Sequence, residues 1–77
     1  MAKIPTNMKI PIKEITVGNL YISKSGSIVV KATGKGQKEN QFAGVIIKTD
    51  GTNDTYVIGY ESDSWYNNNF NDYTEQS

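Results

Sequence analysis

Apolar and polar residues alternate with a period of two along the middle of the chain. In Ser27–Thr33, the side chains of Ile28, Val30 and Ala32 fall on one face, because neighbouring residues of a strand point to opposite sides. The segment is also rich in β-branched residues, which favour extended structure. We therefore predict a strand here, with its Ile-Val-Ala face toward the core.

The longest predicted strand is Gln41–Thr49. Phe42, Gly44 and Ile46 point one way, and the residues between them, which are also apolar, point the other way. A strand with two apolar faces is central in its sheet or covered on both sides. The glycine inside this strand predicts a bulge or a sharp bend, as in a sheet that curls.

Turn signals separate these strands from two further ones, predicted at Leu20–Ile22 and Thr55–Tyr60. The Ser23–Gly26 turn ends in a glycine that is expected to adopt a positive φ. The polar Asp50–Asp54 run is predicted as a hairpin loop. Closely spaced turns without a helical stripe between them predict an all-β fold, a small half-open barrel of four or five antiparallel strands.

The two ends of the chain depart from this pattern. Residues 1–14 contain two Lys-Ile-Pro triplets, and proline removes a ladder donor and favours extended backbone around it. We predict an extended arm at 1–14, a single domain at 15–73 and a frayed tail at 74–77.

The last part of the predicted domain is the least strand-like. Ser62–Ser64 is predicted as a turn or a helix N-cap. Tyr66, Phe70 and Tyr73 stand at i, i+4 and i+7, the spacing of one helical face. The stretch therefore predicts a short C-terminal helical segment, of one or two turns, that closes an end of the barrel.

Composition narrows the chemistry that is available. The 77 residues include no Cys, His or Arg, which removes disulfides, thiolate and imidazole metal ligands and the usual nucleophile–base pairs. We assign no catalytic or metal-binding residue, expect no cofactor and predict that the protein is not an enzyme. Because a chain of this size forms a small core, a homo-oligomer is expected to support it.

No segment has the roughly 18 consecutive apolar residues of a membrane-spanning helix. The first residues also lack the continuous apolar stretch of a signal peptide. We therefore expect a cytoplasmic protein without a membrane partner.

A net charge of zero hides a segregation of charge along the chain. Residues 1–49 contain eight lysines and two glutamates, a net charge of +6, and residues 50–77 contain six carboxylates and no lysine, a net charge of −6. Three interpretations stay open: the halves pair within one molecule, they pair between subunits, or the basic half binds phosphate or nucleic acid. The absence of arginine argues against the third interpretation.

Six of the eight aromatic residues lie within the last 22 residues. These rings either complete the core of a small barrel or form an exposed platform for a flat ligand or a protein partner. Nucleic-acid binding is disfavoured, because the rings lie in the acidic half and are not interleaved with lysines.

The candidate ligand-binding residues combine these rings with lysines in turns. The Gly34–Lys38 loop lacks the spacing of a phosphate-binding loop, although its lysines, like the one in the Ser23–Gly26 turn, can contact a phosphate. The predicted set is Lys24, Lys35, Lys38, Tyr56, Tyr60, Trp65, Tyr66 and Phe70.

Between residues 17 and 66 a series of short motifs follows in order, namely Gly18, Tyr21, Ser25-Gly26, Ile28-Val29-Val30, Thr33-Gly34, Phe42-Ala43-Gly44-Val45-Ile46 and Gly59-Tyr60-Glu61-Ser62-Asp63-Ser64-Trp65. The series resembles that of small SH3-like β-barrel accessory proteins encoded by phages and prophages, from which it departs by the additional Glu61. The resemblance implies an SH3-like barrel and a viral accessory protein that inhibits a host factor or sequesters a nucleotide signal. It transfers no functional residue.

The sequence therefore favours a non-enzymatic viral accessory protein, in a counter-defence role, that sequesters a small nucleotide-like ligand at the interface of a homo-oligomer. One alternative is an inhibitor or adaptor that binds a host protein through the aromatic and acidic C-terminal surface. A second alternative is a minor structural component of the virion.

Overall fold

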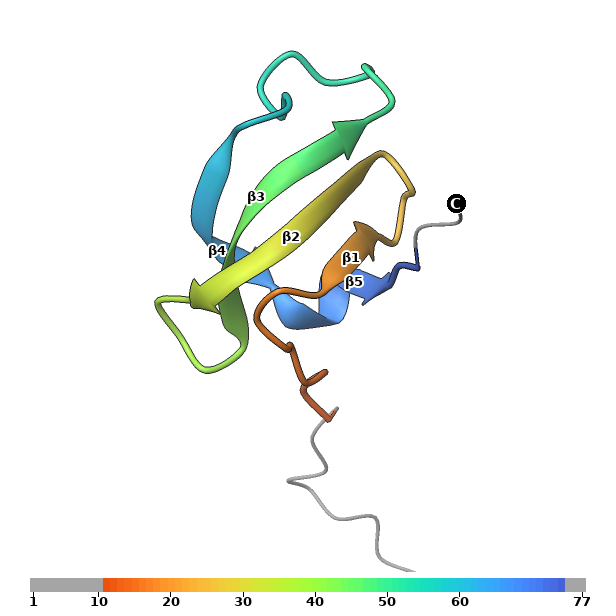
Figure 1. The fold of residues 1–77 in the computed structure, drawn as a ribbon. Coiled ribbons are helices and arrows are strands. Elements are labelled where there is room, and N and C mark those ends of the chain that lie inside the picture. Colours follow the sequence, from red (N-terminus) through yellow and green to blue (C-terminus); the bar gives the residue numbers. More distant parts are fainter. Residues whose placement is uncertain (1–10, 75–77) are drawn as a thin grey trace, which may run out of the picture.

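The computed structural model describes residues 11–74; most of the predicted arm (residues 1–10) and tail (residues 75–77) lie outside the described residues. The described chain is all-β, as predicted. Five antiparallel strands form one sheet in the order β4-β3-β2-β1-β5 (Figure 1). The elements are β1 (Leu20–Ser23), β2 (Ile28–Lys35), β3 (Gln41–Thr49), β4 (Glu61–Tyr66), the 3-10 turn η1 (Asn67–Asn69) and β5 (Phe70–Asp72).

The sheet is strongly curled, because its two edge strands are consecutive in the chain. β4 forms one edge and β5 the other, yet only the three residues of η1 separate them. The edges of a flat five-stranded sheet would lie roughly 19 Å apart, whereas a 3-10 turn rises only about 2 Å per residue. The edges therefore approach each other, and Figure 1 shows the chain crossing behind β2 on its way from β4 to β5.

The core lies on the concave face of this sheet. β2 contributes Ile28, Val30 and Ala32, which are all buried and confirm the predicted inward face of the strand. β3 pairs with β2 and adds the buried side chains of Phe42 and Ile46. Ala43, Val45 and Ile47 of β3 are half-buried, in agreement with a strand that is apolar on both faces.

The glycine of β3 lies at an irregularity of the sheet. The register of β3 against β4 shifts between Phe42 and Gly44, which confirms the predicted bulge. A Cβ atom on Gly44 would overlap the Val30 side chain and the Lys31 carbonyl oxygen. Glycine is therefore required here because the neighbouring strand passes too close for a side chain.

The predicted strand at Thr55–Tyr60 is wrong, because this segment belongs to one long loop, residues 50–60, that joins β3 to β4. The Tyr56 N–H donates to the Asn53 side chain instead of to a neighbouring strand. Gly59 adopts a φ of +95°, which leaves the extended region. The apolar alternation is present, but within Thr55–Tyr60 it is Gly59 and Tyr60, at the end of the loop, that bond to β3, through Ile46.

The predictions for the following residues are also wrong in part. Ser62–Ser64 is neither a turn nor an N-cap; it lies inside β4, which pairs with β3. The helical face of Tyr66, Phe70 and Tyr73 does not form, because Phe70 opens β5 and pairs with Ser23. The only helical geometry in this stretch is the single 3-10 turn of three asparagines, which are poor α-helix formers.

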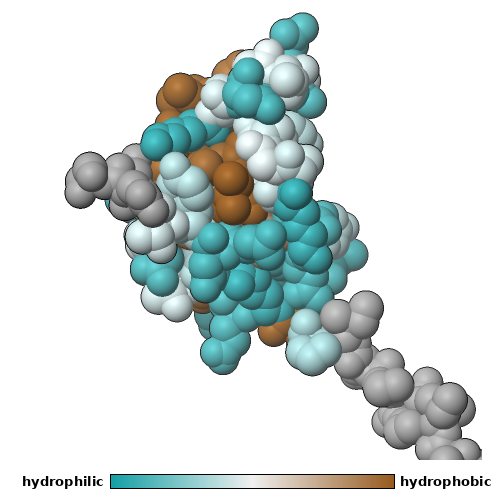
Figure 2. All heavy atoms as spheres, turned by 90° about the vertical axis from the view of Figure 1, so that its right-hand side faces the viewer, coloured by the Kyte–Doolittle hydropathy of each residue, from teal (hydrophilic) through white to brown (hydrophobic). Residues whose placement is uncertain are grey.

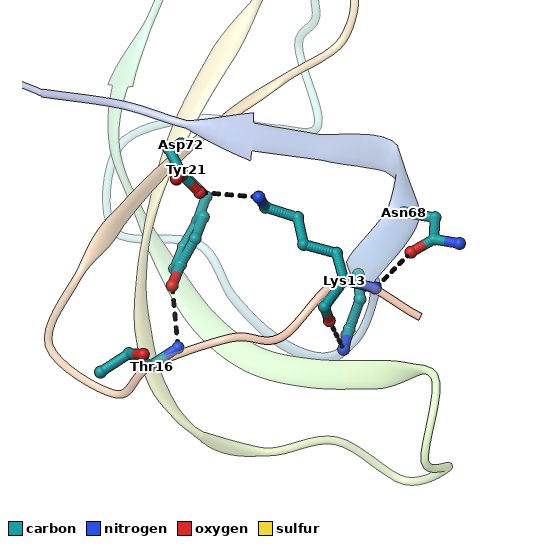
Figure 3. A network of polar contacts seen from close by, with 6 residues as sticks. Lys13, Thr16, Tyr21, Asn68 and Asp72 are labelled. Atoms are coloured by element: carbon teal, nitrogen blue, oxygen red, sulfur yellow. Dashed lines mark hydrogen bonds and ion pairs between the residues drawn. The ribbon is translucent and has the colours of Figure 1, made fainter. Parts of the chain in front are cut away.

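The described part of the predicted arm is bound to the domain (Figure 3). The Lys13 backbone N–H donates to Asn68 Oδ1 at 2.7 Å, and Asn67 Nδ2 donates to the Lys13 carbonyl oxygen at 2.9 Å. The Lys13 ammonium forms an ion pair with Asp72 at 2.7 Å. This pair joins the lysine-rich half of the chain to its acidic half within one molecule.

Candidate functional site

A groove of about 630 Å³ opens between the β1–β2 turn, the 50–60 loop and β4. Its volume lies in the range of small-molecule sites, about 300–1,000 Å³. Figure 2 views the side of the molecule on which the β1–β2 turn lies and shows apolar side chains set between hydrophilic ones. We call this groove, whose lining includes Tyr56, Trp65 and Tyr66, the aromatic groove.

The floor of the aromatic groove belongs to the core. Ile28, Trp65 and Phe70 line it and are each more than nine-tenths buried. The Trp65 indole N–H donates to the Gly44 carbonyl oxygen at 2.9 Å, which fixes the orientation of the ring. Trp65 meets Phe70 edge to face, with ring centroids 5.9 Å apart. The floor is therefore made of packed core side chains.

The accessible aromatic surface of the groove comes from Tyr56, which is 37% exposed. Tyr66 is 48% exposed, but it follows the buried Trp65 in β4, so its ring points to the opposite face of the strand. The Tyr56 ring lies 5.5 Å from that of Trp65. Tyr60 contacts Tyr56 and Trp65, at 5.4 and 6.0 Å, and supports their arrangement without lining the groove.

One rim of the groove is a row of hydroxyl groups. Ser23, Ser25 and Ser27 all line the groove. Ser25 Oγ lies 3.1 Å from Ser23 Oγ and 2.9 Å from Ser27 Oγ. Ser23 Oγ also accepts the backbone N–H groups of Ser27 and Ile28. Lys24 is exposed and also lines the groove. This rim can therefore hydrogen-bond to an anionic group.

The opposite rim is the first part of the 50–60 loop, which side-chain hydrogen bonds hold in shape. Asp50 Oδ1 accepts from the Thr52 backbone N–H at 3.0 Å and from the Thr52 hydroxyl at 2.6 Å. These bonds favour the ionised carboxylate and lower the pKa of Asp50 below its ordinary value. Asn53 Oδ1 accepts the N–H groups of Thr55 and Tyr56 and so positions the Tyr56 ring.

The structure divides the predicted site residues between two places. Lys24, Tyr56, Trp65, Tyr66 and Phe70 all line the aromatic groove, and Tyr60 packs beside it. Lys35 and Lys38 line a separate hollow beside the N-terminal segment.

The sequence prediction missed most of the polar residues that line the aromatic groove. The three serines could have been recognised from the sequence, because alternate positions 23, 25 and 27 all carry a hydroxyl side chain. Thr52, Asn53 and Asn69 lie in loops and turns and give no such signal.

Within residues 11–74, no group of three or more carboxylates comes together to hold a metal ion. The same residues contain no helix of the length and apolar character needed to cross a membrane. Comparison of the chain with protein-family models, with curated proteins and with solved structures finds no match in any of the three.

Proposed function

We propose that this chain is a non-enzymatic binding protein that holds a flat, anionic, nucleotide-like ligand in the aromatic groove. The observation that carries the proposal is the presence of the accessible Tyr56 ring, a hydroxyl rim and Lys24 in the lining of one groove of suitable volume. Aromatic faces bind bases by stacking, and the rim offers donors to a phosphate.

The charge of the groove limits the ligand. Among residues 11–74, Lys24 is the single basic residue of the lining, so one phosphate or phosphodiester fits the site better than a triphosphate. The ring stack supplies the affinity for a base, and the serine hydroxyls supply neutral donors that do not depend on salt. A cyclic mononucleotide, a cyclic dinucleotide or a nucleoside monophosphate has this combination of groups.

The proposal includes a finer description of the fold. The strand order, with a single 3-10 turn between β4 and β5, supports an SH3-like half-open barrel. Together with the motif resemblance, this leads us to propose a viral accessory protein that acts against a host defence in the host cytoplasm. Both rims and the floor come from one chain, so the ligand is proposed to bind within a protomer, and a homo-oligomer would stabilise the small domain.

Calorimetry of the full chain against nucleoside monophosphates, cyclic mononucleotides and cyclic dinucleotides tests the proposal. We expect saturable binding of at least one ligand class without turnover. Tyr56→Ala should weaken it about tenfold or more, because one base–ring stack is worth about 1–3 kcal/mol. Lys24→Gln should weaken the phosphorylated ligand more than its nucleoside. Lys38→Gln, outside the groove, is the matched control; absent binding across the panel would reject the proposal.

A second candidate function is supported by the tip of the 50–60 loop. Val57 is 48% exposed and Ile58 is 65% exposed, and the neighbouring Asp54 and Glu61 carry negative charge. An apolar tip with an acidic border suits a host protein with a basic, apolar pocket, as in an inhibitor or adaptor. Ile58→Ser should then abolish recovery of a stoichiometric partner from host lysate while leaving nucleotide binding unchanged.

A further inference from the structure

The described N-terminal segment, residues 11–17, precedes β1 and belongs to no strand; we call it the strap. Lys13 and Ile15 are half-buried, and the other residues of the strap are exposed. Gly18, with a φ of +95°, turns the chain into β1, and its N–H donates to the Ala32 carbonyl oxygen at 2.8 Å. The strap therefore starts from a turn that is fixed to β2 and buries little surface of its own, as in segments that open locally while the rest of a protein stays folded.

Side-chain hydrogen bonds hold the strap against the domain (Figure 3). In η1, Asn68 accepts the Lys13 backbone N–H and Asn67 donates to the Lys13 carbonyl oxygen, so both backbone groups of this residue are bound. Nearer to β1, the Thr16 N–H donates to the Tyr21 hydroxyl at 2.8 Å. The closed strap therefore depends on a few side chains, and two of them belong to one turn.

One of these side chains is incompletely paired while the strap is closed. Asn67 is 6% exposed, and within the described part of the chain its Oδ1 is a buried oxygen that accepts no hydrogen bond. A buried acceptor without a partner destabilises the state that contains it. Departure of the Lys13 carbonyl oxygen would free the Asn67 amide to turn toward water. The closed strap is therefore less stable than its contacts alone suggest.

The turn that holds the strap also reaches the aromatic groove. Asn69, which follows Asn68 in η1, lines the groove, and its carbonyl oxygen accepts the Lys24 backbone N–H at 2.9 Å. This bond ties the β1–β2 turn, with its Lys24 rim, to η1. Because each residue of a chain has only two soft dihedral angles, a shift of Asn68 is passed on to Asn69. The strap and the rim of the groove are thus attached to neighbouring residues of one short turn.

We propose that the strap regulates the aromatic groove. The closed strap holds η1 in the position in which the Asn69 carbonyl oxygen fixes the Lys24 rim, and the open strap releases both, which lowers the affinity of the groove for its ligand. Because coupling between two sites is reciprocal, a ligand in the groove favours the closed strap. The effect on affinity rests on the function proposed for the groove, whereas the coupling of the strap to Lys24 does not.

Amide hydrogen exchange of the isotope-labelled full chain, followed by NMR without ligand, tests the coupling. Lys13→Gln removes the ion pair with Asp72 and leaves the residues of η1 unchanged. It should raise the exchange rates of the Thr16 and Lys24 amides about twofold or more, because the strap opens more often. The Ile46 amide, in the core strand β3, should keep its rate. An unchanged rate at Lys24, or an equal rise at Ile46, would overturn the proposal.

A neighbouring strap residue provides the matched control for this variant. Glu14 is exposed and has no hydrogen bond or ion pair within residues 11–74. Glu14→Gln therefore changes one charge of the strap without removing a contact. It should leave the exchange rates of the Thr16 and Lys24 amides at their wild-type values, and the same rise as in Lys13→Gln would show that the contact with Asp72 is not the cause.

A variant of η1 tests the regulation of binding. Asn68 lies outside the lining of the aromatic groove, so Asn68→Ala removes strap bonds without removing a ligand contact. It should weaken binding of the nucleoside monophosphate or cyclic nucleotide that binds most tightly, at least threefold. The same ligand at saturation should slow Thr16 exchange in the wild type at least threefold. Wild-type affinity in Asn68→Ala, or no slowing at Thr16, would overturn the regulation. If no nucleotide binds, the function proposed for the groove fails, and exchange at Lys24 decides on the coupling alone.

Discussion

The β2–β3 pair and the 50–60 loop contain similar residues in opposite environments. In the pair, Val30 and Ile46 are fully buried, whereas in the loop Val57 and Ile58 are about half and two-thirds exposed. β2 and β3 bond to each other along most of their lengths. Most of the loop instead satisfies its backbone through local turns and through the Asn53 side chain.

The difference teaches that β-branched and aromatic residues do not by themselves make a strand. A strand also needs a neighbour that accepts its ladder hydrogen bonds, because β-propensity measures how a residue fits a paired, half-buried surface. In this molecule the loop lacks such a neighbour over most of its length. The side chains of Val57 and Ile58 therefore remain at the surface.

The largest expected effect is at the centre of the core. Phe42 contacts the rings of Tyr21 and Phe70, with centroids 5.9 and 5.3 Å away. Phe42→Ala should lower the free energy of unfolding by about 3–5 kcal/mol, enough to unfold a domain this small. Circular dichroism with urea titration measures this, and a cooperative, native-like Phe42→Ala protein would show that the core lies elsewhere.

A matched pair of isoleucines tests the comparison directly. Ile46→Ala in β3 should cost about 2–5 kcal/mol, because it leaves a cavity in the core. Ile58→Ala in the loop should change stability by less than about 0.5 kcal/mol, because the side chain is mostly solvated. Urea denaturation of both variants provides the measurement. Equal losses would mean that the loop tip is packed in solution.

A matched pair of glycines probes the close approach of β2 and β3. Gly44→Ala should cost about 1–3 kcal/mol, since its Cβ would overlap Val30 and the Lys31 carbonyl oxygen. Gly34→Ala, in β2, meets nothing within 4 Å and serves as the control. In thermal melts, the Tm of Gly44→Ala should be lower than that of Gly34→Ala. A Gly44→Ala protein as stable as the wild type would contradict the observed strand spacing.

The smallest expected effect concerns the loop and pH. The Thr52 hydrogen bonds lower the pKa of Asp50 in the folded state, so their stabilisation is present above the unfolded-state pKa. It is lost as the pH falls through the folded-state pKa. NMR titration of the Asp50 carboxyl should show its pKa rising toward the ordinary value in Thr52→Val. No change in that variant would show that Thr52 is not the cause.

The sequence predicted the centre of the molecule better than its C-terminal third. The inward face of β2, the bend at Gly44 and the positive φ of Gly26 follow from local rules and are confirmed. β4 was missed because Glu61–Tyr66 is an edge strand with mostly exposed polar residues. The preceding loop has the stronger apolar alternation, and only the tertiary structure shows which segment pairs with β3.

The candidate site was predicted in part for a similar reason. The sequence identifies the aromatic rings and the lysines as candidate binding groups. It does not show which of them line the same groove. The curled sheet brings Lys24 to the same groove as Tyr56 and Trp65, and it leaves Lys35 and Lys38 at a separate hollow beside the N-terminal segment.

The most direct test of the proposed aromatic groove is an NMR titration of the labelled full chain with the best ligand of the nucleotide panel. We predict that the largest shifts fall on residues 23–27 and 52–56 and on the Trp65 indole N–H, whose bond to Gly44 holds it at the floor. Shifts confined to residues outside these segments, or none at saturating ligand, would contradict the account.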